Sequence, residues 1–128
     1  MDLHELSFAQ ITIHQDNNIA EVIVNNEIEI TKKIVDEYQI FLYSHLQPPF
    51  SLLINKKNSY SYSFEGHQQL RSFKEISAIA VVVHNKVTME STKLLASYPR
   101  DIPLNLEMFS NRDKAFNWLQ VQQKQLKS

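Results

Sequence analysis

The longest uninterrupted apolar run in the chain is Ala78-Ile79-Ala80-Val81-Val82-Val83, and His84 follows it directly. Valine and isoleucine favour extended backbone because branching at Cβ restricts their side chains in a helix. A strand with one wet face alternates apolar and polar residues, whereas this run does not alternate. The pattern therefore predicts a central strand of a parallel or mixed sheet, with both faces covered.

Four other segments have the pattern of strands, and they cover residues 8–14, 19–24, 50–55 and 104–108. The turn signal Asp16-Asn17-Asn18 joins the first two, because short Asx side chains tolerate left-handed backbone, and it predicts a hairpin. In the last segment Asn105 and Glu107 alternate with apolar residues, which predicts an edge strand with one polar face.

Helical spacing of apolar residues predicts three helices between these strands. Thr31 is the expected N-cap of the first helix, which Pro48-Pro49 ends, because proline lacks an amide hydrogen. Ser63 is the expected cap of a second helix that reaches about Phe73, although Gly66 lies inside it and glycine weakens a helix. A third helix is expected from Lys86 to Tyr98.

A fourth helix is expected near the C-terminus. Ser110 and Asp113 have the spacing of a capping box. The apolar residues of this helix are Ala115, Phe116, Trp118 and Leu119. Residues 120–128 are rich in Gln and Lys, and we expect a helical tail whose end frays.

The resulting order is β-β-α-β-α-β-α-β-α, over one domain that spans residues 1–128. Strands that alternate with helices indicate right-handed crossovers between parallel neighbours. The sequence therefore predicts an α/β fold with a mixed, mostly parallel sheet of about five strands.

Composition excludes several classes of function. Gly66 is the single glycine of the 128 residues, so neither a Walker loop nor a dinucleotide fingerprint can be written. Cysteine is absent, which rules out thiolate catalysis and fits a reducing, cytoplasmic compartment. The formal net charge of −1 gives no indication of nucleic-acid binding, and no apolar run is long enough to span a membrane. The five histidines have no metal-ligand spacing. We expect no cofactor, no metal and no catalytic residue.

His84 is the first candidate for ligand or anion binding. It follows the predicted central strand, and ligands of open α/β sheets collect beyond the carboxyl ends of the strands. The alternative is a partly buried histidine that bonds to a loop carbonyl.

The segment from Lys56 to Ser63 holds the other candidates, and we expect it to be a loop as far as Tyr62. Lys56, Lys57 and Ser63 would bind an anion at the start of the second helix, where amides and the helix dipole favour negative charge. Ser59, Ser61 and Ser63 are possible modification sites. The alternative is a helix cap in a solvated loop. Tyr60 and Tyr62 suit either a contact surface or packing over the end of the sheet.

The segment from Ser77 to Leu119 resembles the C-terminal half of SpoIIAA-like domains, which are also described as STAS-like or CRAL-TRIO-like. The features that carry the resemblance are the run Ile79-Ala80-Val81-Val82-Val83, the helix after it, Ile102-Pro103, Met108-Phe109 and Lys114-Ala115-Phe116-Asn117-Trp118-Leu119. The N-terminal half agrees in element order and in Phe50-Ser51-Leu52-Leu53-Ile54. The chain is similar in particular to small bacterial stand-alone members whose role is undefined.

This resemblance implies a non-catalytic regulatory module that binds a protein partner, with a homodimer as one form of it. A second subunit would cover the second face of the central strand. The alternative is a protein that binds a small hydrophobic ligand or lipid. Related anti-anti-sigma factors carry a phosphorylatable serine in an Asp-Ser-Ser-Gly stretch, whereas the comparable region here, Asn55 to Phe64, lacks both the aspartate and the Ser-Ser-Gly. The phosphoswitch role is therefore not transferred.

Overall fold

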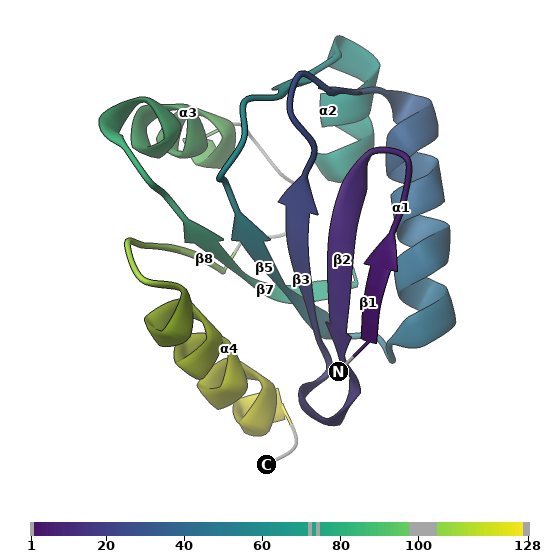
Figure 1. The fold of residues 1–128 in the computed structure, drawn as a ribbon. Helices are drawn as coiled ribbons and strands as arrows, with labels where there is room; N and C mark the ends of the chain where they lie inside the picture. The colour runs from purple at the N-terminus through teal and green to yellow at the C-terminus, as the bar shows by residue number, and fades with distance from the viewer. Residues whose placement is uncertain (1, 72, 74, 98–104, 127–128) are drawn as a thin grey trace.

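The computed structural model describes residues 2–71, 73, 75–97 and 105–126. Six strands form one sheet in the order β1-β2-β3-β5-β7-β8, and their bounds are Asp2–Glu5, Ala9–His14, Ile19–Val24, Phe50–Asn55, Ile76–Val82 and Leu106–Phe109. β1, β2 and β3 pair antiparallel, while β5, β7 and β8 extend the sheet in parallel from β3 (Figure 1). This arrangement confirms the expected α/β class with a mostly parallel sheet.

The sheet has one strand more than the expected five. β1 was missed because only His4 among its residues is partly buried, so the strand has no apolar pattern to detect. The hairpin of β2 and β3 is confirmed, and Asn18 in its turn has a φ of 58°, in the left-handed region. Among the described residues, β8 lies at the edge of the sheet, as the alternation of its polar residues predicted. Residue 104, with which the predicted strand began, lies outside the described residues.

β7 is covered on both faces, as its apolar run predicted. Ala78, Ala80 and Val82 belong to one core cluster together with Leu119 of α4, the helix Arg112–Leu126. Ile79 packs against the core cluster of the opposite face. The small alanine side chains let α4 approach the sheet closely, and Figure 1 shows this helix on the other side of the sheet from α1 (Lys32–His45) and α2 (Phe64–Arg71).

The start of α4 differs from the prediction. Its cap is Asn111, whose Oδ1 accepts from the Lys114 amide at 3.0 Å, so the expected capping box at Ser110 is wrong by one residue. The helix continues through the expected tail to Leu126; the end of that tail, residues 127 and 128, lies outside the described residues. Gln123, in this part of the helix, is buried against the sheet.

Gln123 joins a buried polar group between α4 and the sheet. Its Oε1 accepts from Ser51 Oγ at 3.2 Å and from Ser77 Oγ at 3.0 Å. Buried polar atoms that find partners hold one packing arrangement, because any other leaves them unsatisfied. α4 therefore covers the face of β7 for which a second subunit was expected. The homodimer stays a prediction, but this argument no longer supports it.

An ion pair fixes the start of α4 to β3. The Arg112 guanidinium donates to both carboxylate oxygens of Glu21, with Nε to Oε2 at 2.9 Å, and His14 Nε2 lies 3.0 Å from Oε1. Burial acts to raise the pKa of Glu21, but the bonds from Arg112 and His14 outweigh burial and hold the pKa below its ordinary value of 4.5.

We expect Glu21→Gln to flatten the pH dependence of stability. A lowered folded-state pKa gives stability that is present above the unfolded pKa and lost as the pH falls through the folded one. The variant should be less stable than wild type at neutral pH, and the difference should shrink as the pH falls below 4.5 and through the lowered pKa of Glu21. Urea unfolding at several pH values measures this, with Glu107→Gln as the exposed control. A constant difference across the range would contradict it.

The opposite face of the sheet is covered by α1 and α2. The predicted cap of α1 is confirmed, since Thr31 Oγ1 accepts from the Ile34 amide at 3.3 Å. The predicted cap of α2 is also confirmed, since Ser63 Oγ accepts from the Gly66 amide at 2.9 Å. A short second sheet, β4 (Glu29–Ile30) with β6 (Ser61–Tyr62), lies between these helices and ties their N-terminal ends together. α3 spans Lys86–Ser97; its expected end at Tyr98 lies outside the described residues.

Candidate ligand cavity

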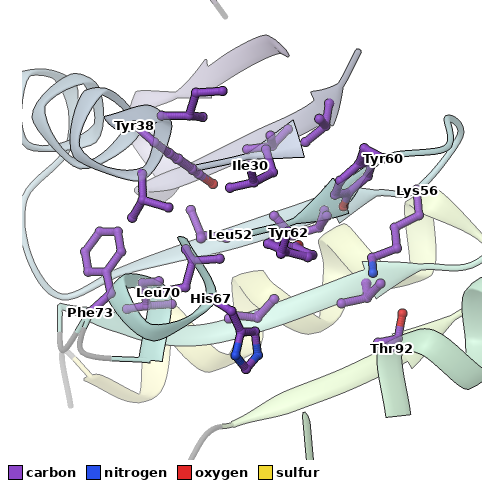
Figure 2. Close-up of a pocket in the computed structure, with 18 of the residues that line it drawn as sticks. Ile30, Tyr38, Leu52, Lys56, Tyr60, Tyr62, His67, Leu70, Phe73 and Thr92 are labelled. Atoms are coloured by element: carbon purple, nitrogen blue, oxygen red, sulfur yellow. The ribbon is translucent and has the colours of Figure 1, made fainter. Parts of the chain in front are cut away.

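A cavity of about 150 Å³ lies between the sheet and the helices that cover this face. Most of its wall is apolar, with side chains from three strands and from α2 (Figure 2): Val22, Leu52, Ile54, Ile79, Val81 and Leu70. The few polar side chains of its wall are Tyr38, Lys56, Tyr60, Tyr62, His67 and Thr92. Among the described residues, no carboxylate lines it. Concave apolar sites with a few polar groups are typical of small-ligand pockets.

Lys56 reaches this cavity because it continues the alternation of β5. Leu52 and Ile54 face the cavity. Lys56 points to the same side as these two residues, because its amide still donates to the Val82 carbonyl at 3.0 Å and so continues the strand pairing. Only 8% of the residue is exposed, and its Nζ lies 5.6 Å from the centre of the Tyr60 ring. Burial lowers the pKa of the Lys56 ammonium.

Three tyrosines place hydroxyl groups around the same space. Tyr62 lies in β6, so the interpretation of residues 56–62 as a loop is wrong at its end. The Tyr60 hydroxyl is buried, and among the described residues it makes no hydrogen bond of ordinary length; its nearest interaction is with the Tyr62 hydroxyl, and its ring packs edge-on against the Tyr62 ring. Burial raises the pKa of Tyr38, Tyr60 and Tyr62, so all three keep their protons and remain donors at neutral pH.

Thr92 brings α3 to the cavity. It is 2% exposed, and its hydroxyl donates to the Thr88 carbonyl at 2.7 Å, so its proton is already used. Figure 2 shows Thr92 Oγ1 and the Lys56 ammonium pointing toward one another from α3 and from the end of β5. The Thr92 oxygen can therefore accept but not donate at this end of the cavity.

His84 does not line the cavity. Its Nε2 donates to Asn55 Oδ1 at 2.6 Å, and the residue is exposed at the carboxyl edge of the sheet. It therefore satisfies the buried Asn55 side chain, and the partner is an amide oxygen rather than the loop carbonyl considered above.

Each of the other predicted site residues has a role different from that of Lys56. Lys57 is exposed, whereas Lys56 beside it is buried. Ser63 caps α2 and donates to the Ile30 carbonyl at 3.3 Å. Ser59 and Ser61 are exposed, and the Ser59 amide donates to Asn26 Oδ1 at 3.0 Å.

Most of the wall was missed by sequence reasoning, because its members come from strands and helices far apart in the chain. The detectable signal was the alternation Phe50, Leu52, Ile54, Lys56, which places the lysine on an apolar face. Tyr62 carries no such signal, since β6 has two residues.

Two other kinds of site, a metal centre and a membrane span, are absent from the part of the chain that the structure describes. Its residues include no group of three or more His, Asp or Glu side chains that could hold a metal ion. None of its helices has the length and apolarity to cross a membrane.

Comparison with known proteins places the fold. No family model matches the chain, and no curated protein matches it. A solved structure that matches is that of an uncharacterized protein of the DUF3478 family, with a SpoIIAA-like fold, from Shewanella loihica PV-4. The match has a TM-score of 0.60 at 16% identity and covers 87% of this chain and 91% of the other. The chain therefore has a SpoIIAA-like fold, which confirms the predicted resemblance at the level of fold.

Proposed function

We propose that the protein is a non-catalytic binding module whose cavity holds a small ligand with an apolar body. The observation that supports this most is the cavity itself, about 150 Å³ in volume and lined mainly by aliphatic and aromatic side chains. Apolar cavities of about this size take up benzene-sized molecules. Its polar groups are few, and three of them, Lys56, Tyr60 and Thr92, lie at one end, so they would orient a ligand rather than surround it.

The proposal is tested with 3-phenylpropan-1-ol and 3-phenylpropanoate as probes in an NMR titration of the full chain. We expect saturable shifts of backbone signals from residues that line the cavity. Val81→Phe, which places a larger side chain in the wall, should weaken binding about tenfold or more, because it fills the space of the phenyl group. Val121→Phe on α4 is the control, since Val121 is 51% exposed and does not line the cavity.

Absence of saturable shifts for both probes would refute the proposed function. Equal binding by wild type and a folded Val81→Phe variant would also refute it, because the probe would then sit elsewhere. The thermal unfolding midpoint of each variant confirms that it is folded.

A second candidate is the protein-interaction module, with a protein partner or a second copy of the chain. It is supported by exposed apolar side chains in the first turns of two helices, Phe64 at 72% and Val87 at 77% exposure. α3 begins just after His84, which follows the carboxyl end of β7, and apolar groups on a surface favour protein contacts. Light scattering that shows a monomer at micromolar concentration would count against a second copy.

The cytoplasm stays the proposed location, as expected for a chain without cysteine.

A further inference from the structure

We infer that the ligand of the cavity is a monocarboxylate, whose acid group binds Lys56 and Tyr60 while its apolar body fills the space beyond them. This inference rests on the proposed function, since it names the chemical class of the ligand for the same cavity.

The first argument is the charge of Lys56. Only 8% of the residue is exposed. A buried charge is costly unless an opposite charge or hydrogen bonds compensate it. Among the described residues, Lys56 forms no ion pair. Its ammonium instead lies over the face of the Tyr60 ring. A ligand anion would supply the missing partner.

The second argument is an imbalance between donors and acceptors. The Lys56 ammonium is a buried donor that points into the cavity. The buried Tyr60 hydroxyl is a second donor; its proton is directed toward the Tyr62 hydroxyl, but the two do not approach to ordinary hydrogen-bond length. A carboxylate carries two oxygens and only accepts, so it can take a bond from each of these two donors. A ligand alcohol would satisfy one of them and bring a further donor.

The third argument concerns the size and the apolarity of the remaining space. Beyond the polar end, the wall is mainly apolar, with Leu52, Leu70 and Phe73 among its residues, and His67 and Tyr38 are the polar side chains there (Figure 2). Lys56 is the one Lys or Arg among the described lining residues, and His67 lies at a different part of the wall, so the charge that a ligand meets at the Lys56 end is a single positive one. A single carboxylate with an aromatic or aliphatic body therefore fits better than a phosphate ester.

The test compares matched probes of equal length, 3-phenylpropanoate with 3-phenylpropan-1-ol and octanoate with octan-1-ol, by calorimetry or NMR at neutral pH. We expect each acid to bind wild type at least about tenfold more tightly than its alcohol, because hydrogen bonds to charged groups are the stronger ones. The two acids distinguish an aromatic body from an aliphatic one.

Variants assign the effect to the polar end of the cavity. Lys56→Met keeps the length and apolar stem of the side chain and should abolish the preference for the acid over its alcohol. Tyr60→Phe should reduce the preference in part. Lys57→Met is the matched control, because Lys57 is the exposed neighbour, and it should change neither affinity. Acid affinity of wild type should fall as the pH rises through the pKa of Lys56, which burial has lowered.

The outcomes separate the two levels of the proposal. If acid and alcohol bind wild type equally, or if a folded Lys56→Met variant keeps the preference for the acid, the carboxylate inference fails and the proposed function stands. If neither probe binds at the cavity, the proposed function fails and the inference falls with it.

Discussion

Replacing Gly66 with alanine should destabilise the protein by about 2–3 kcal/mol, although alanine is the better helix former by about 1 kcal/mol. A Cβ at this position would lie 2.1 Å from the Ile30 carbonyl oxygen and 3.0 Å from the Thr31 carbonyl carbon. Both are backbone atoms of the segment that leads into α1, so no side chain can turn aside. The Ile30 oxygen also accepts from Ser63, so the clash would separate α2 from β4 and from the start of α1.

Chemical denaturation of wild type and variant measures this effect. Gln68→Ala is the matched control, because Gln68 is an exposed residue of the same helix and should change stability by no more than about 0.5 kcal/mol. A Gly66→Ala variant as stable as wild type would contradict the close approach of α2 to the Ile30 carbonyl. Because α2 forms part of the cavity wall, the same variant should also bind the probes more weakly.

Replacing Leu119 with alanine should cost about 2–5 kcal/mol, the range for removing most of a buried leucine from a core. Leu119 is fully buried and belongs to the cluster of Leu53, Ala78 and Ala80 between α4 and the sheet. The neighbours are small or lie on strands, so they cannot easily move to fill the space. Most of the loss should therefore remain as an unfilled cavity.

Val121→Ala is the control for this prediction, since Val121 lies on the same helix but is 51% exposed. We expect this control to change the free energy of unfolding by about 0.5 kcal/mol. Equal effects of the two substitutions would show that α4 does not pack on the sheet as described. In that case the cover of β7 by a second subunit would again need consideration.

Much of the fold was predictable because its signals are local. The unbroken apolar run of β7 indicated two covered faces, Asp16-Asn17-Asn18 indicated the hairpin turn, and the Thr31 and Ser63 hydroxyls indicated helix starts. Each signal depends on the preferences of a few adjacent residues, so the rest of the chain is not needed to interpret it. Asn111 is the exception, because two polar residues in succession offered two possible caps.

The cavity was less predictable for a physical reason. Lys56 was identified as an anion-binding candidate, but as part of a loop with Lys57, and adjacent residues of an extended segment point in opposite directions. The structure separates the two lysines, one in the cavity and one in solvent. The direction of each depends on hydrogen bonds to β7, a strand that lies twenty residues further along the chain.

By itself, the sequence determined the class of the fold, the caps of α1 and α2 and the order of strands and helices apart from β1, β4 and β6, because neighbouring residues specify these features. It also determined that both faces of β7 must be covered. Only the tertiary structure decided that α4 supplies that cover, that Gly66 is needed where two backbones meet, and that Lys56 is buried with no ion pair to the described residues. These features depend on contacts between distant segments, and packing of the whole chain selects them.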